Sequence, residues 1–246
     1  REGVFPLARS FDTAGWFSST GKDMVELLEL LWKPGKRGGA LRNAEGGEEQ
    51  NGLVWYAPRT VRLSEECRES YRGFLEGQPT VERSSSGAEE IARKLDAVSE
   101  DSFWAYNVIG SCEAFEVHRN WFTVYRERYN PDVWRLIDRS RHWESGALDY
   151  ARRLQEEVTA LLDSVLASWD AILMPAVHTV APRKSEVDQE FRVDIIRLTS
   201  IASLAGLPVL TIPLKSASGF SCGVQVISRP ERALHVARRF LTGEAE

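Results

Sequence analysis

The amino-acid sequence predicts an α/β fold in which a mixed β-sheet is flanked by helices. The main observation comes from residues 170–241, where short apolar runs alternate with helical patterns in the order strand, helix, strand, turn, strand, helix. This order is typical of a sheet covered by a layer of helices. Two longer amphipathic helices are predicted upstream, and a central strand that is apolar throughout needs such helices to bury it.

The N-terminal segment, residues 4–17, predicts an extended stretch followed by a turn. Asp12 and Thr13 can form hydrogen bonds with nearby backbone N–H groups and so fix that turn, while Gly15 is expected to allow a close or left-handed backbone. A helix is predicted for residues 21–32, with Thr20 or Ser19 as its N-cap. Its apolar stripe consists of Met24, Leu27, Leu28 and Leu31.

The middle of the chain predicts loops, one strand and two long helices. Residues 33–52 are rich in Gly and charge and predict a surface loop, residues 53–57 a short strand, and residues 76–87 another loop. Apolar residues recur at helical spacing over residues 101–128 and over residues 145–169.

The C-terminal region predicts the sheet itself. Residues 170–176 form a short apolar run that ends in Pro175, as expected of a central strand. A helix is predicted for residues 190–205, with Gly206 as its C-terminal glycine. Strands are predicted for 209–214 and 223–228, a turn for 215–221, and a final helix for 230–241.

Composition excludes several classes of protein. The 246 residues carry a net charge of −5, which argues against a nucleic-acid binder. Three widely spaced cysteines predict reduced thiols in a cytoplasmic protein and no disulfide or zinc scaffold. No apolar run is long enough for a membrane span. Because the first residue is Arg1, the natural N-terminus is expected to be missing.

Two blocks of sequence carry a family resemblance. In the first, Pro6, Asp12, Thr13 and Gly15 follow the pattern P-x5-D-T-x-G and lead into a helix. The second has D-x4-P at Asp170 and Pro175, then A-G-L-P at residues 205–208, a strand ending in Pro213, and G-x-Q-x-I at residues 223–227. The order and spacing resemble the amidase-signature enzymes. The resemblance implies that residues 1–246 form the C-terminal part of one amidase-signature domain, incomplete at its N-terminal side, with residues 33–167 as a variable, mostly helical substrate-side region.

The resemblance also implies a chemistry whose key residues are absent from this sequence. The family uses a Ser nucleophile, a second Ser on a cis peptide and a Lys, all upstream of the D-T-x-G block. We therefore assign no catalytic residue, no metal and no cofactor to this chain. The expected activity is Ser-dependent hydrolysis of a small-molecule amide, completed by the N-terminal half of the same enzyme or by an oligomer partner.

Other nucleophile and ligand patterns have simpler interpretations. Ser19 and Lys22 have S-x-x-K spacing, but at a helix start they predict a cap and an exposed amine. The glycines at 15 and 21 have the wrong spacing for a phosphate-binding loop, and Asp23 replaces its Ser or Thr. Residues 84–87 predict a loop and a helix N-cap. The four histidines show no metal-ligand spacing, and the three cysteines are expected to be core residues.

Substrate contact is the role we expect for this chain. The candidates lie after the first turn, after Pro175 and before the A-G-L-P block: Trp16, Phe17, His178, Arg197, Thr199 and Ser203. In relatives that bind a charged amino-acid amide, an acid lies three residues before the Thr that matches Thr199. Ile196 holds that position here, so the resemblance favours an apolar or aromatic amide over a glutamine-type substrate.

Two alternatives remain. The chain could be a catalytically inactive amidase-like binding or scaffold protein, or an unrelated α/β domain with accidental matches. The second alternative requires that residues 170–228 do not form a β-layer. Half of a sheet exposes edges and an apolar face, so we also expect the chain to need a covalent or separate partner for stability.

Overall fold

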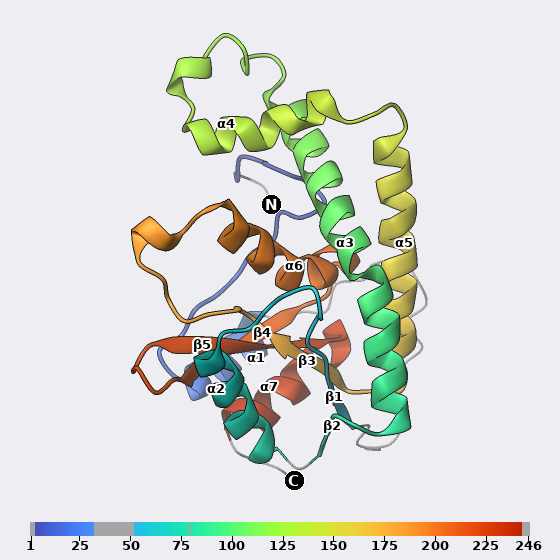
Figure 1. Cartoon of the computed structure of the whole chain (residues 1–246), viewed down its shortest axis with the longest axis vertical. Helices are drawn as coiled ribbons and strands as arrows, with labels where there is room; N and C mark the ends of the chain where they lie inside the picture. Colours follow the sequence, from blue (N-terminus) through green and yellow to red (C-terminus); the bar gives the residue numbers. More distant parts are fainter. Residues whose placement is uncertain (1–2, 32–51, 79, 243–246) are drawn as a thin grey trace.

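The computed structural model describes residues 3–31, 52–78 and 80–242, which form a five-stranded sheet with helices on both faces (Figure 1). The strand order is β2-β1-β3-β5-β4. β1 is parallel to β2 and to β3, whereas β5 is antiparallel to β3 and to β4. The sheet is therefore mixed, as the sequence predicts. The strands are β1 (Leu53–Trp55), β2 (Val81–Glu82), β3 (Ala171–Pro175), β4 (Val209–Lys215) and β5 (Ser221–Ser228).

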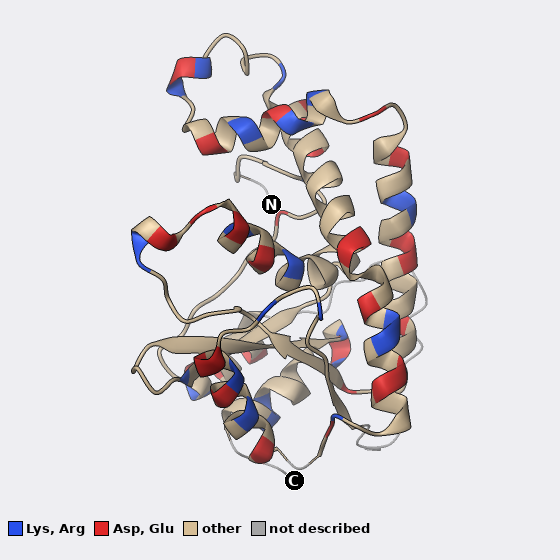
Figure 2. Ribbon diagram, in the orientation of Figure 1, with Lys and Arg blue, Asp and Glu red and all other residues tan. Residues whose placement is uncertain are grey.

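The helices form two layers around this sheet. They are α1 (Gly21–Leu31), α2 (Glu65–Glu76), α3 (Ser86–His118), α4 (Pro131–Asp138), α5 (Ala147–Leu166), α6 (Gln189–Ala205) and α7 (Ala233–Leu241). Figure 1 shows α3, α5 and α6 on one side of the sheet and α1, α2 and α7 on the other. Within the described parts of the chain, no helix is both long enough and apolar enough to cross a bilayer. Figure 2 shows Lys and Arg interspersed with Asp and Glu along the helices in this view.

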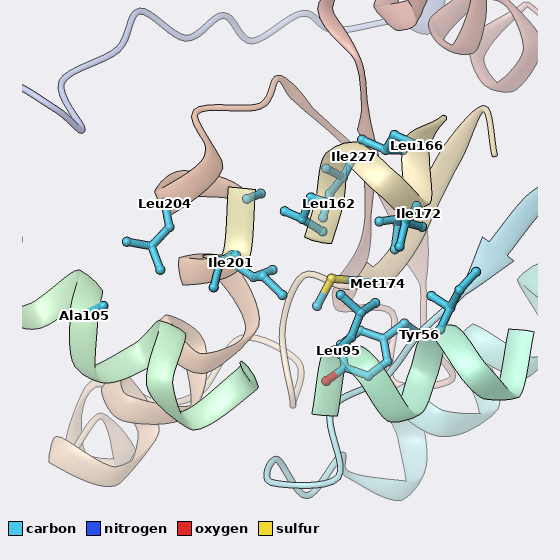
Figure 3. Close-up of a cluster of buried hydrophobic side chains, with 14 of the residues drawn as sticks. Tyr56, Leu95, Ala105, Leu162, Leu166, Ile172, Met174, Ile201, Leu204 and Ile227 are labelled. Carbon is cyan, nitrogen blue, oxygen red and sulfur yellow. The ribbon is translucent and has the colours of Figure 1, made fainter. Parts of the chain in front are cut away.

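Strand β3 is the centre of the molecule because it is buried at all five positions. Side chains alternate between the two faces of a strand. Ile172 and Met174 therefore join the core beneath α3, α5 and α6, which Figure 3 shows, while Ala171 and Leu173 join the core against α2 and α7. Burial on both faces explains why this strand is apolar throughout.

Local capping sets several helix boundaries. Thr20 accepts a hydrogen bond from the Asp23 amide at the start of α1, and Ser85 accepts one from the Ala88 amide at the start of α3. Gly206 ends α6 with a φ of 64°, in the left-handed region that glycine adopts without strain. The predicted C-terminal glycine is confirmed, the cap of α1 is Thr20 of the two candidates Thr20 and Ser19, and the N-cap expected within residues 84–87 is Ser85.

The helical middle region differs from the prediction in three ways. The helix expected at residues 101–128 begins at Ser86 and ends at His118. Residues 76–87 contain β2 as well as a loop, and helices α2 and α4 are absent from the prediction. Beyond the end of this helix, Phe122 stacks on Trp134 of α4, with ring centroids 5.0 Å apart. The loop predicted at residues 33–52 lies almost entirely outside the described residues.

An aromatic cluster closes the C-terminal end of α3. The indole of Trp121 donates a hydrogen bond to Nδ1 of His118, and the Tyr129 hydroxyl lies 2.6 Å from the same nitrogen. An indole N–H can only donate, so Nδ1 carries a lone pair and the proton of the neutral ring is on Nε2. The ring of Phe5 packs edge-on against His118 and so attaches the N-terminal segment to the cluster.

We expect the aromatic cluster to make the stability of the protein depend on pH. Burial lowers the pKa of His118 below its ordinary value, so the unfolded chain takes up this proton at a higher pH than the folded chain does. Neutral His118 therefore contributes fully to the free energy of unfolding above about pH 6.5, and this contribution is lost as the pH falls through the pKa of the folded state. Urea unfolding between pH 7.5 and 5 should therefore show a steeper loss of stability for the natural protein than for His118→Gln, which cannot titrate.

The exposed His235 on α7 gives a matched control. His235→Gln is expected to keep the pH dependence of the natural protein. The prediction is contradicted if the free energy of unfolding falls with pH equally in the natural protein and in His118→Gln.

Candidate functional site

The candidate site is the corner between α6 and the edge strand β4, which we call the α6–β4 corner. Thr211 of β4 lies opposite Gln225 of β5, and Gln225 reaches α6, so both side chains lie on the α6 face of the sheet. Val209 and Pro213 share that face with Thr211, because alternate residues of a strand point the same way. All three residues are exposed, so α6 covers β5 but leaves this part of β4 open.

The floor of the α6–β4 corner is held by Gln225. Its buried amide Nε2 donates to the carbonyl of Pro175 at 2.9 Å and to that of Leu198 at 3.0 Å. One side chain thus links the end of β3, strand β5 and helix α6. Gly223 lies beside it, where an added Cβ would sit 3.1 Å from Thr211 Cγ2 and 3.4 Å from Ala176 Cβ. The second motif block of the sequence is therefore a packing unit at the carboxyl end of β3.

Three partly exposed residues of α6 lie on one face of the helix. Ile196, Thr199 and Ser203 are spaced by three and four residues, so they share a helix face, and each is partly exposed. The Thr199 hydroxyl donates to the Ile195 carbonyl and the Ser203 hydroxyl donates to the Thr199 carbonyl. Because both protons are engaged within the helix, these oxygens present lone pairs that can accept a hydrogen bond from a bound molecule.

Arg197 lies on another side of α6. Its guanidinium forms ion pairs with Glu100 at 2.8 Å and Asp194 at 3.2 Å and lies over the ring of Phe103. Burial alone would lower the pKa of Arg197, but the two carboxylates raise it above its ordinary value. The structure thus brings Thr199 and Ser203 together and turns Arg197 toward α3.

His178 lies in the loop that follows β3. Its ring packs against Phe191 at the start of α6, with centroids 4.8 Å apart, and its backbone carbonyl accepts a hydrogen bond from Ser64. Tyr71 holds the same loop by donating to the Val177 carbonyl at 2.7 Å. Nδ1 of His178 is buried and has no hydrogen-bond partner among the described residues.

Trp16 and Phe17 lie on the segment that runs from the first turn to α1. Phe17 is 99% exposed and Trp16 is 37% exposed. The carboxylate of Asp12 accepts hydrogen bonds from the amides of Leu7 and Ala8, which confirms that Asp12 fixes a turn. The prediction for Gly15 is wrong, since its φ is not positive and an added Cβ would meet no atom within 4 Å.

Ser19 and the cysteines have structural roles. Ser19 donates to Asp23 at the exposed start of α1, so the S-x-x-K spacing is a helix-cap feature. Burial raises the pKa of Cys67 to about 11 and raises that of Cys112, so neither thiol is poised as a nucleophile. Over residues 3–31, 52–78 and 80–242, no three His, Cys, Asp or Glu side chains gather as they would around a metal ion.

Sequence analysis missed two features that organise the site. One is the pair of hydrogen bonds from Gln225, which the motif marks without revealing its partners. The other is a hollow of about 420 Å³ between α5 and the end of α6, lined by Gln155, Glu156, Thr159, Ala160, Asp163, Leu204 and Ala205. Side-chain spacing along α5 carries no signal for this hollow, because α6 supplies its other wall.

Comparison with known proteins finds similarity to amidases and to amidotransferase A subunits. The profile of the family described as Amidase matches residues 84–233, more than half of the chain. The A subunit of the glutamyl-tRNA(Gln) amidotransferase of Synechococcus sp. is 25% identical over 98% of this chain and 56% of its own length. Its namesake from Thermotoga maritima is 31% identical over 32% of this chain and 17% of its own length.

A solved structure extends the match to the fold. The crystal structure of an amidase superposes with a TM-score of 0.75 at 26% identity, over 99% of this chain and 55% of that protein. The chain thus spans about half the length of the solved amidase and of the Synechococcus protein.

Proposed function

Because this chain belongs to the amidase family, we propose that it supplies the C-terminal half and part of the substrate pocket of a Ser-dependent amide hydrolase. In this proposal residues 1–246 are one part of an amidase-signature domain, and residues 33–167 shape its substrate side. The Ser, cis-Ser and Lys come from polypeptide outside these 246 residues, either the N-terminal half of the same enzyme or an oligomer partner. Three free thiols support a cytoplasmic location.

The observation that carries the proposal is the open α6–β4 corner. β4 is an edge strand of the described sheet, and Val209, Thr211 and Pro213 on its α6-side face are exposed. Val209 of this face is 40% exposed, and Phe17 of the N-terminal segment is 99% exposed. Edge strands and apolar patches of this kind are normally covered. Additional strands on β4 would cover them and close a pocket against α6.

The chemistry that follows is acyl transfer. The Ser oxygen attacks the amide carbonyl carbon, ammonia or an amine leaves with a proton, and water then hydrolyses the acyl-enzyme. Thr199 and Ser203 are suited to accept a hydrogen bond from the amide N–H of the substrate. Arg197 holds α6 against α3 through Glu100 and so contributes to the pocket indirectly.

The polarity of the corner favours a neutral apolar amide. Ile196 adds an alkyl surface beside the two hydroxyls, and the basic groups of α6 are engaged by Glu100, Asp194 and Asp132. A substrate carboxylate would lose hydration without gaining a cation. We propose His178, Trp16 and Phe17 as further substrate contacts, on the basis of the buried Nδ1 atom and the exposed aromatic rings.

Labelling with a fluorophosphonate, which reacts with activated serines, tests this proposal. The natural protein, isolated with an antibody against this chain, is expected to be labelled on a serine outside the 246 residues, whereas the chain expressed alone stays unlabelled. A portion of the same preparation that has not been treated with the fluorophosphonate is expected to hydrolyse hexanamide about tenfold or more faster than glutamine in kcat/KM.

Two outcomes would contradict the proposal. Labelling on a serine of this chain would show that the nucleophile is here. A natural preparation that is neither labelled nor able to hydrolyse amides would favour the alternative, a non-catalytic binding or scaffold protein.

A further inference from the structure

Four polar side chains from three distant parts of the sequence meet beside the N-terminal segment. They are Ser10 of that segment, Glu113 of α3, and Arg152 and Gln155 of α5, and we call them the polar clamp. Glu113 and Arg152 form an ion pair, with side chains that are 16% and 38% exposed. The polar clamp is therefore partly shielded from water, which strengthens its charge-assisted hydrogen bonds.

Arg152 is the centre of the polar clamp. Its guanidinium donates to Ser10 Oγ at 3.1 Å, to Gln155 Oε1 at 2.9 Å and to the carboxylate of Glu113. Ser10 donates to Glu113 through both its amide and its hydroxyl. Burial alone would raise the pKa of Glu113, but the hydrogen bonds from Ser10 and the pairing with Arg152 hold that pKa below its ordinary value. The carboxylate thus stays charged and binds both partners.

The polar clamp also reaches the α6–β4 corner. Gln155 donates through Nε2 to the carbonyl of Leu204 at 2.9 Å, one residue before the Ala205–Pro208 stretch that leads from α6 into β4. Arg152 orients Gln155 for this contact by donating to its carbonyl oxygen. A single guanidinium therefore links the N-terminal segment on one side with the end of α6 on the other.

Aromatic contacts hold the same segment beside the polar clamp, and one of them is the contact of Phe5 with His118. The turn at residues 7–12 docks through Phe11, whose ring lies 4.7 Å from that of Tyr106. Further along the chain, α1 packs on α7. Figure 1 shows the residues in between descending from the α3 and α6 layer to α1 on the other side of the sheet. These residues include Trp16 and the fully exposed Phe17, which follow the turn that the polar clamp holds.

We propose that Arg152 is a positioning residue that sets the N-terminal segment relative to the end of α6 and thereby fixes the width of the substrate pocket. This inference rests on the proposed function for its effect on catalysis. Its mechanical part, that Arg152 holds the N-terminal segment in place, is argued from the contacts of the polar clamp alone.

Hydrogen–deuterium exchange of the full chain tests the mechanical part. Arg152→Met is expected to speed amide exchange in peptides covering residues 4–17 by about tenfold or more, because it removes three charge-assisted hydrogen bonds. Arg152→Lys is expected to give an intermediate rate. Its ammonium can pair with Glu113, but a single nitrogen cannot reach all the acceptors that two guanidinium nitrogens reach. Arg153→Met is the matched control, because this neighbouring arginine lies over the ring of Tyr150. It should leave the exchange of residues 4–17 unchanged.

Ser10→Ala provides a milder test if Arg152→Met does not fold, and the same peptides are expected to exchange faster. In the complete enzyme, Arg152→Met should raise KM for amide hydrolysis while kcat changes less, with partial rescue by Arg152→Lys. A loss of folded enzyme alone would instead lower kcat at constant KM.

The outcomes distinguish the positioning role of Arg152 from the proposed function. Unchanged exchange in both Arg152→Met and Ser10→Ala overturns the clamp, whatever the activity. Faster exchange with an unchanged KM overturns the positioning role. Faster exchange in a natural protein that hydrolyses no amide supports the clamp and overturns the proposed function.

Discussion

Arg232→Met is expected to lower the free energy of unfolding by about 3 kcal/mol, the lower end of the range for a broken buried ion pair. Asp170, at the start of β3, has a side chain that is 2% exposed, and its carboxylate lies 2.5 Å from the Arg232 guanidinium. Removing the arginine leaves a buried charge without a partner. The loss stays at the low end because a third of the Arg232 side chain is exposed to solvent.

A double-mutant cycle in urea measures this effect. Asp170→Asn combined with Arg232→Met is expected to be more stable than Arg232→Met alone, because the double variant buries no unpaired charge. Lys94→Met is the control, since the Lys94–Glu90 pair is exposed on α3 and such pairs contribute at most about 1 kcal/mol. Equal losses for Arg232→Met and Lys94→Met would show that burial of Asp170 does not determine the cost.

Gln225→Leu is expected to lower the free energy of unfolding by about 2–4 kcal/mol. The substitution retains most of the side-chain volume but leaves the carbonyls of Pro175 and Leu198 buried without their donor, and each such group costs about 1–3 kcal/mol. Thermal and urea unfolding measure the loss. We also expect faster hydrogen exchange in α6, because Gln225 ties this helix to the sheet.

Two further variants define the cause. Gln225→Glu keeps the shape but offers a carboxylate to two carbonyls, so it should be unstable at pH 7 and partly recover at acidic pH, where a protonated carboxyl can donate one hydrogen bond. Thr211→Val, on the exposed strand opposite Gln225, should change stability by no more than about 0.5 kcal/mol. A fully stable Gln225→Leu would mean that the two carbonyls do not depend on this amide.

The sequence by itself determined the parts of this protein that local rules control. Alternating apolar runs located β3, β4 and β5, Gly206 marked the end of α6, and Ser85 and Thr20 marked helix starts, because hydrophobic periodicity and capping act over a few neighbouring residues. The two motif blocks placed the chain in the amidase family. Asp12 was expected to close its own turn, and it does so through bonds that span five residues or fewer.

Only the tertiary structure decided where distant residues meet. The spacing of α6 could not show that Arg197 pairs with Glu100, since that depends on the position of α3. Gln225 lies 50 residues from Pro175, and Arg152 lies 142 residues from Ser10. Beyond the end of α3 at His118, Phe122 stacks on Trp134, a contact between residues 12 positions apart. Each of these contacts is a property of packed elements, and the free energy that selects it comes from burial that no short stretch of sequence contains.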